Sequence, residues 1–210
     1  AALRTVIADG ALGAVRTAHI ATGQYLPDWR PDADYRDGVS AQAALGGGVL
    51  LELSHELDYA RWFFGHPSSI TAEAGKLSDL DMQVEDSATV IYGYPDKRVT
   101  ISVDFLQRVA SMTLKVVGAQ ATLEADMITE TARILAPGGI TELDMPKLTQ
   151  GNEMYLRQFD AFFAKAFADY MPQFDGSRQI GFAGFDDAAA VLRLVDAAKR
   201  SAASGTRILL

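Results

Sequence analysis

A succession of short strand-like runs between residues 69 and 143 constrains the fold of this chain more than any other feature. β-Branched and aromatic residues are frequent in these runs, and turn-forming residues separate several of them, as at residues 95–97 and 137–139. Connections this short join antiparallel strands, because parallel neighbours need a long crossover. The pattern therefore predicts a large, predominantly antiparallel sheet made of residues 69–75, 87–94, 99–106, 112–117, 121–125, 132–136 and 140–143.

Helical segments flank these runs on both sides. Apolar residues recur at helical spacing after residue 48 as far as residue 64, and again in residues 153–170 and 186–203. Residues 1–9 also indicate a helix, which Gly10 would end, whereas residues 15–25 and 206–210 are typical of strands. We therefore predict an α+β domain over residues 1–210, with helices packed on one face of one open sheet. Residues 1–14 would link it to a preceding domain.

The other face of the predicted sheet needs either water or a partner. Ile101, Val103 and Phe105 would make part of that face too apolar for water. This interpretation predicts a homodimer or homotetramer that assembles through the open face of the sheet.

The charge and the composition exclude several classes of function. A formal net charge of -8 would repel a phosphate backbone, so no nucleic-acid partner is expected. The absence of cysteine rules out disulfides and thiolate metal sites, which makes the cytoplasm the expected location. No apolar run approaches the roughly 18 residues that span a bilayer, and the N-terminal residues lack the order of a signal peptide. Neither membrane insertion nor secretion is therefore expected.

The segment from residue 46 to residue 65 holds the most chemically informative residues. His55 lies opposite the apolar stripe of the predicted helix, with Tyr59 and Trp62 beside it and Glu52 and Asp58 about one turn away. An imidazole among aromatic rings and carboxylates is typical of a proton carrier. A single histidine on a helix is also often a structural residue, and the spacing alone leaves both interpretations open.

Two further groups suggest a binding site around this helix. Gly46, Gly47 and Gly48 carry no side chains at its start, where backbone could approach a flat cofactor. The proline-rich loop at residues 26–40, a candidate substrate lid, holds aromatic and guanidinium groups that suit a sugar ring and an anionic substituent. A plain turn and a solvated loop are the structural alternatives. The candidate substrate-binding residues are Trp29, Arg30, Tyr35, Arg36 and, at a strand end, Arg108.

The sequence from Gly46 to Asp58 resembles the signature of the Gfo/Idh/MocA oxidoreductase family, in which a glycine-rich turn and an acidic residue precede His-x-x-Asp on a helix. Shorter segments at residues 24–31, 84–86, 152–155 and 197–201 resemble the same family in the same order. The resemblance implies that the chain is the C-terminal α+β domain, which binds substrate and forms dimers. It also implies a preceding Rossmann domain that binds NAD or NADP, since the chain lacks both a Gly-x-Gly-x-x-Gly turn after a strand and a Glu-Lys-Pro motif.

The same resemblance implies roles for individual residues. His55 would take the proton from a hydroxyl of a sugar or polyol, nucleotide sugars included, as the nicotinamide receives hydride. Asp58 would orient the ring or the helix, and Glu52 would act as a relay although it stands one residue nearer the histidine than the family's acidic residue. The glycine turn would lie against a cofactor held mainly by the preceding domain, so the chain alone is expected to be inactive.

Other functions stay open on the sequence alone. The chain could be a non-catalytic sugar-binding or dimerisation module. Glu52 and Asp58 also suggest a glycoside hydrolase, but two carboxylates on one helix do not flank a bond. Glu52-x-x-His55 is half of a di-iron motif whose second half is missing from the sequence, so no metal site is expected.

Overall fold

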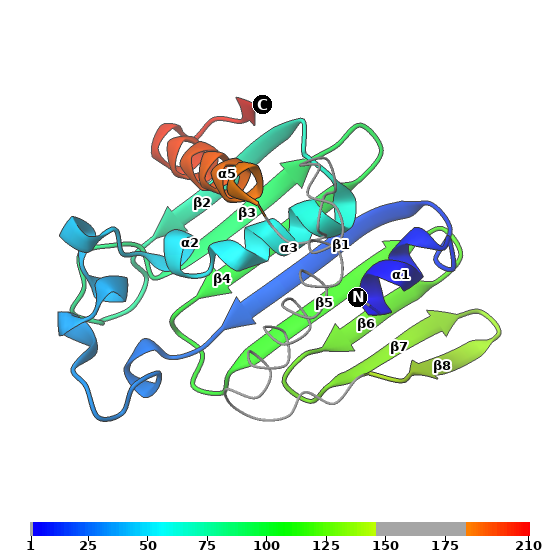
Figure 1. Cartoon of the computed structure of the whole chain (residues 1–210), viewed down its shortest axis with the longest axis horizontal. Helices are drawn as coiled ribbons and strands as arrows, with labels where there is room; N and C mark the ends of the chain where they lie inside the picture. The colour runs from blue at the N-terminus through cyan, green and yellow to red at the C-terminus, as the bar shows by residue number, and fades with distance from the viewer. Residues whose placement is uncertain (1, 146–183) are drawn as a thin grey trace, which may run out of the picture. The chain divides into compact units, whose positions relative to one another are not determined.

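The computed structural model describes residues 2–145 and 184–210 (Figure 1). The chain divides into two compact units, one of residues 1–145 with 189–210 and the other of residues 146–188. The helix predicted at residues 153–170 and the family-like segment at residues 152–155 lie outside the described residues. The candidate site residues all belong to the first unit.

A nine-stranded sheet forms the centre of the first unit. Its order is β8-β7-β6-β5-β1-β4-β3-β2-β9, and its neighbours are antiparallel except β1 and β4, which run parallel. The predicted α+β fold with a predominantly antiparallel sheet is therefore confirmed. β1 is inserted between β4 and β5, although these two strands follow each other in the sequence. The strands are β1 (Val15–Gly23), β2 (Ser69–Gly75), β3 (Ser87–Gly93), β4 (Arg98–Asp104), β5 (Ser111–Gly118), β6 (Thr122–Asp126), β7 (Thr131–Ala136), β8 (Gly139–Leu143) and β9 (Ile208–Leu209).

The helices of the first unit cover one face of this sheet (Figure 1). The opposite face, over which no helix of the described residues lies, is called the uncovered face below. The single helix predicted to end at residue 64 is in fact two helices, because Leu53, with φ -102° and ψ 27°, leaves helical geometry between them. Short 3-10 turns occupy much of the predicted lid loop. The helical elements are α1 (Ala2–Ala8), η1 (Leu26–Asp28), η2 (Tyr35–Asp37), η3 (Val39–Ala41), η4 (Ala43–Leu45), α2 (Val49–Glu52), α3 (Ser54–Phe64) and α5 (Phe185–Ser204), of which residues 185–188 belong to the second unit.

β1 and β4 end at Gly23 and Asp104, short of the predicted limits at residues 25 and 106. The carboxylate of Asp104 accepts hydrogen bonds from the amides of Leu106 and Gln107 at 2.9 and 3.2 Å, so the chain turns there. The amide of Tyr25 in turn donates to the carbonyl of Gln107 at 2.7 Å. The segments that follow β1 and β4 are therefore joined to each other at one edge of the sheet.

Buried polar contacts attach the helices to the covered face. The hydroxyl of Tyr92 on β3 donates to the carbonyl of Leu57 on α3 at 3.3 Å, and the amide of Ala72 on β2 donates to Oγ of Ser201 on α5 at 2.9 Å. Burial raises the pKa of Tyr92 well above its usual range. The tyrosine is therefore a neutral hydrogen-bond donor in this core.

Ile101, Val103 and Phe105 belong to the core beneath the helices, so the prediction that they lie on the uncovered face is wrong. Successive side chains of a strand point to opposite faces. On β4, Thr100 and Ser102 alternate with the buried residues and lie on the uncovered face. The apolar residues at alternate positions thus mark the face that packs against the helices.

Charged side chains in register cross the uncovered face. Nζ of Lys115 on β5 lies 2.9 Å from Oε1 of Glu124 on β6, and the guanidinium of Arg133 on β7 lies 2.9 Å from Oε2 of the same carboxylate. Hydrogen bonds from Lys115 and then from Arg133 lower the pKa of Glu124 below its usual value. A hollow of about 580 Å³ surrounds these side chains.

Replacing Glu124 by glutamine is expected to lower the free energy of unfolding by at most about 1 kcal/mol at neutral pH, because ion pairs at a surface contribute little. A lowered pKa means that the carboxylate stabilises the fold at neutral pH and loses this contribution as the pH falls through its pKa in the folded state. The difference between the two proteins should therefore vanish in acid. Urea unfolding at neutral and acidic pH measures it, and a difference that persists in acid would contradict the argument.

Candidate functional site

His55 lies in the first turn of α3, where the helix restarts after the break at Leu53. Its side chain is 49% exposed, and its ring meets the Tyr59 ring edge-on with the centroids 6.0 Å apart. The sequence predicted that this histidine lies away from the packed stripe of the helix, and the structure has it on that exposed side. An imidazole that is half exposed is accessible to a ligand.

A carboxylate that sequence reasoning missed lies directly against this ring. Oε1 of Glu56 is 3.3 Å from Nε2 of His55, which is within ion-pair distance, although the geometry is not that of a hydrogen bond. Glu56 is buried on the inner side of α3, with 1% of its surface exposed. A signal was present in the sequence, because an acidic residue stands three positions after Leu53 and four before Ala60 and therefore falls on the apolar stripe.

The other two acidic candidates have different surroundings. The carboxylate of Asp58 accepts hydrogen bonds from Nε and a terminal nitrogen of Arg61 at 3.1 and 3.0 Å, one turn along α3. Glu52 is the last residue of α2, on the far side of the break at Leu53. Among the contacts of the described residues, neither carboxylate reaches the His55 ring, and Asp58 is engaged with the helix instead.

Neighbouring segments of the chain fill most of the space beside the glycine turn. A Cβ on Gly47 would lie 2.3 Å from the carbonyl oxygen of Val39, and a Cβ on Gly48, whose φ is +107°, would meet the Glu85 carboxylate. Gly46 is different, because a Cβ there would meet nothing within 4 Å. Only the Gly46 position among these three therefore leaves space for an approaching ligand.

The turn also connects the lid loop, the loop between β2 and β3, and the start of α2. The Glu85 carboxylate accepts from the amide of Leu50 at 3.4 Å and lies 3.8 Å from Nζ of Lys199 on α5. Backbone hydrogen bonds fasten the three segments together. They run from the amides of Gly47, Gly48, Val49 and Gln83 to the carbonyls of Gln42, Ser40, Glu85 and Ala41, respectively.

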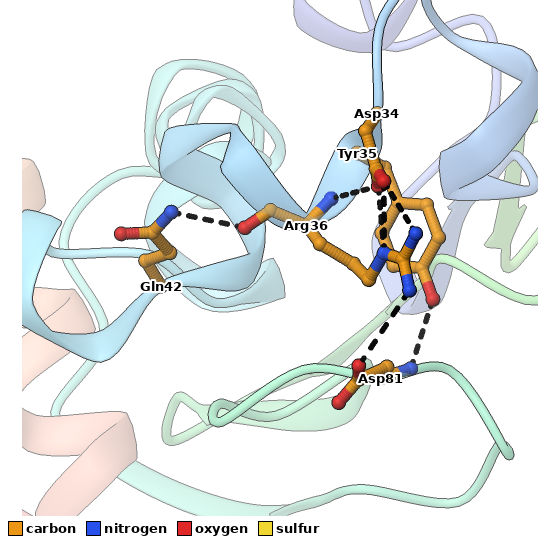
Figure 2. Close-up of polar contacts among 5 residues, drawn as sticks. All are labelled: Asp34, Tyr35, Arg36, Gln42 and Asp81. Carbon is orange, nitrogen blue, oxygen red and sulfur yellow. Dashed lines mark hydrogen bonds and ion pairs between the residues drawn. The ribbon is translucent and has the colours of Figure 1, made fainter.

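The predicted substrate residues of the lid loop fall into two groups. Figure 2 shows the guanidinium of Arg36 bound to the carboxylate of Asp34, with Asp81 4.0 Å away. This contact lowers the pKa of Asp34 to about 2 and raises that of Arg36. Tyr35 also points toward Asp81, and its hydroxyl accepts from the amide of Asp81 at 2.9 Å. Arg36 thus has a partner of its own, whereas Tyr35 joins the lid loop to the loop between β2 and β3.

Among the contacts of the described residues, none joins Trp29 or Arg30 to Tyr35 or Arg36. The Trp29 ring packs edge-on against Phe105, with the centroids 5.3 Å apart, and its Nε1 is buried without a hydrogen-bond partner among the described residues. Arg30 is exposed. Trp29 therefore anchors the loop to the core, which is the structural alternative that the sequence left open.

A hollow of about 440 Å³ brings Tyr35 and Arg108 together. The guanidinium of Arg108 lies 3.5 Å from the centroid of the Tyr25 ring, a cation–π contact that holds it at the hollow. Among the described residues Arg108 has no carboxylate partner. The hollow opens at the sheet edge where β1 and β4 end, and it is lined by Tyr25, Tyr35, Leu77, Ser78, Asp79, Leu80, Leu106 and Arg108.

Residues 2–145 and 184–210 hold no group of three or more histidine, aspartate and glutamate side chains that could bind a metal ion. In the same residues, no helix has the length and apolar character needed to cross a membrane.

Known structures share this fold. An aldose-aldose oxidoreductase from Caulobacter crescentus, solved with glycerol, is 23% identical with a TM-score of 0.78 over 99% of this chain. An oxidoreductase from Agrobacterium radiobacter, solved with NAD+, L-tartaric acid and magnesium, is 18% identical with a TM-score of 0.77 over 99% of this chain. GenD2 of gentamicin A biosynthesis, solved with NAD, is 26% identical with a TM-score of 0.70 over 99% of this chain.

The chain covers 59%, 60% and 59% of the lengths of these three proteins, respectively. No curated protein matches the sequence well enough to count as a relative. The family described as GFO/IDH/MocA C-terminal domain matches residues 1–124, which is more than half of the chain. The chain therefore belongs to the GFO/IDH/MocA family, and its fold is that of the family's C-terminal domain.

Proposed function

We propose that this chain is the substrate-binding and catalytic half of an NAD(P)-dependent oxidoreductase that acts on a hydroxyl-bearing carbon of a sugar or polyol. The observation that carries the proposal is the half-exposed imidazole of His55 beside the buried carboxylate of Glu56. The family supports it, as do neighbours whose names are aldose-aldose oxidoreductase and levoglucosan dehydrogenase. Neighbours solved with NAD+ or NADH support a nicotinamide cofactor.

His55 would take the proton of the substrate hydroxyl while hydrogen leaves the same carbon as hydride. The protein's part in this step is to hold and move the proton at a ring nitrogen of His55. A bound nicotinamide supplies the hydride acceptor. Water is kept from the inner side of the ring by α3 itself, because Glu56 and Leu57 are buried there.

The residues present fit only a small part of a dinucleotide. Gly46 leaves open space at the turn before α2, but the positions of Gly47 and Gly48 are filled by the carbonyl of Val39 and the carboxylate of Glu85. We therefore assign Gly46 to the cofactor side of the site and most of the cofactor contacts to a preceding Rossmann domain. The 210-residue chain by itself is expected neither to bind NAD(H) nor to turn over substrate.

The hollow beside Tyr25, Tyr35 and Arg108, whose lining does not include His55, is the proposed place for the part of the sugar that lies away from the reacting hydroxyl. Tyrosine rings suit the apolar face of a sugar, and a guanidinium that has no carboxylate partner in the described part of the chain suits a carboxylate or phosphate substituent. The sequence also predicted Trp29, Arg30 and Arg36 as substrate-binding residues, but their surroundings make them weaker candidates for binding the sugar. Trp29 is an anchor, and Arg36 is neutralised by Asp34.

Replacing Arg108 by alanine is expected to raise KM for an anionic sugar substrate by about 10- to 100-fold, because a hydrogen-bonded charge pair is lost. The value of kcat should change little, since this contact is made in the ground state and in the transition state alike. Steady-state kinetics of the full-length protein measure both constants, with Arg193→Ala, an exposed arginine on α5, as the matched control. A fall in kcat with unchanged KM would place Arg108 elsewhere in the mechanism.

The test of the proposed function is a substrate panel on the full-length protein. Aldoses, sugar acids, polyols and nucleotide sugars are supplied with NAD+ or NADP+, and nicotinamide absorbance is followed. Reduction of the cofactor by a member of the panel is the expected result. Binding of sugar without any reduction would favour the alternative, a non-catalytic sugar-binding module.

We also propose that the protein forms a homodimer or homotetramer in the cytoplasm through the uncovered face of the sheet. The support is the row of charges that Lys115, Glu124 and Arg133 form across strands in register, because alternating signs can pair with a second copy. Light scattering after size-exclusion chromatography tests the assembly. A monomer at micromolar concentration would contradict it.

A further inference from the structure

Glu56 is a charged residue type among buried apolar residues on the inner side of α3. The inner side of this helix also carries Leu57 and Ala60, which are buried in the core together with Leu53 just before the helix. Glu56 is as buried as they are, and Oε1 of its carboxylate has no hydrogen-bond partner among the described residues. Burying a carboxylate in this way is costly unless a charge or a hydrogen bond compensates for it. A buried carboxylate oxygen that costs stability and accepts no hydrogen bond among the described residues is a candidate for function.

The group that can compensate is the His55 imidazole. Its Nε2 lies 3.3 Å from Oε1 of Glu56, and the remainder of the ring is exposed. The neighbouring ionisable groups have partners of their own, since Asp58 binds Arg61 and the Tyr92 hydroxyl binds the Leu57 carbonyl. The structure therefore places one buried acceptor against one nitrogen of one exposed ring.

We propose that Glu56 is a positioning residue for His55, an inference that rests on the proposed oxidoreductase function. The contact is an ion pair rather than a hydrogen bond, and the negative charge 3.3 Å from Nε2 favours the tautomer that carries its proton on that nitrogen. The Nδ1 lone pair is then available to the substrate. When the substrate O–H bond breaks, its proton goes to Nδ1 and the electrons of that bond form the carbonyl. The hydrogen on the same carbon leaves with the C–H bonding pair as hydride, which a bound nicotinamide would accept. The ring then carries a positive charge, which the Glu56 carboxylate balances.

The first test separates this role from a structural one. Glu56→Gln in the full-length enzyme is expected to lower kcat by about 10- to 100-fold, in the range found when the partner of a functional histidine is removed. KM should stay within a factor of about two and the melting temperature should stay equal or rise, because a buried carboxylate whose Oε1 accepts no hydrogen bond among the described residues has been removed. Glu56→Asp should recover part of the activity, and Glu73→Gln, on the exposed side of β2, is the control that should change nothing. Wild-type kcat in Glu56→Gln, or a loss of kcat that only follows a loss of stability, would overturn the proposal.

The second test does not depend on catalysis. The chain holds three histidines, so His19 and His66 serve as internal references for His55 in nitrogen-15 NMR of the imidazoles. Glu56→Gln is expected to shift the ring-nitrogen signals of His55 toward the other tautomer while those of His19 and His66 stay unchanged. A response of His55 in a protein without oxidoreductase activity would leave the Glu56 contact standing and sink the proposed function. Unaltered His55 signals would overturn the contact itself.

Discussion

Replacing His55 by asparagine is expected to lower kcat of the full-length enzyme by about 10²- to 10⁴-fold, because the substrate hydroxyl loses its proton acceptor. The affinity for NAD(H) should be nearly unchanged, since most cofactor contacts are assigned to another domain. Asparagine keeps a polar side chain of similar size on the exposed side of α3, so folding should be preserved. Steady-state kinetics and a fluorescence titration with NADH measure the two quantities separately.

The matched control for this variant is His66→Asn. His66 is exposed in the turn between α3 and β2, and its replacement should leave kcat at the wild-type value. If His55→Asn turned over substrate as fast as His66→Asn, His55 would have no part in the reaction. The site would then have to be sought around the hollow at Arg108.

Replacing Asp86 by asparagine is expected to lower the free energy of unfolding by about 3 kcal/mol, which corresponds to a fall in melting temperature of about 6–12 °C for a chain of this size. Asp86 is completely buried, and its carboxylate accepts hydrogen bonds from the amides of Leu77 and Ser78 at 2.7 and 3.0 Å as well as from the Ser78 hydroxyl. The asparagine amide presents an N–H group to one of these donors, and that donor is left without an acceptor.

Urea and thermal unfolding measure this loss, and Asp96→Asn provides the comparison. Asp96 lies in the exposed turn between β3 and β4, where its partner is the neighbouring Lys97, so its replacement should leave the free energy of unfolding nearly unchanged. Equal stability of the two variants would mean that Asp86 does not hold the loop of residues 76–86 in place.

The sequence could predict the strands because their period of two is a local property. It could not predict the neighbours of β1, since the pairing of Thr17 with Arg98 depends on residues far apart in the chain. The assignment of Ile101, Val103 and Phe105 to the uncovered face failed for a related reason. Alternation tells which residues of a strand share a face but not which face the helices cover.

The candidate site was predictable in part. His55 stands out because its neighbours on the outer side of α3 are aromatic, and Tyr35 and Arg108 were chosen for their chemistry. Glu56 was missed because a glutamate beside a histidine is ordinary on a solvated helix face, and only burial makes it unusual. The same limit applies to Arg36, whose pairing with Asp34 is a property of the folded turn.

The position of β1 has a consequence for how this domain reaches its native state. Strands β2 to β4 form one set of hairpins and β5 to β8 a second set, and each can form from sequence neighbours alone. β1 joins the two sets, because His19 pairs with Thr100 of β4 on one side and with Lys115 of β5 on the other. The insertion of β1 requires a long loop to close, which costs entropy. We therefore expect the insertion of residues 15–23 between the two sets of strands to be the last and slowest step in folding.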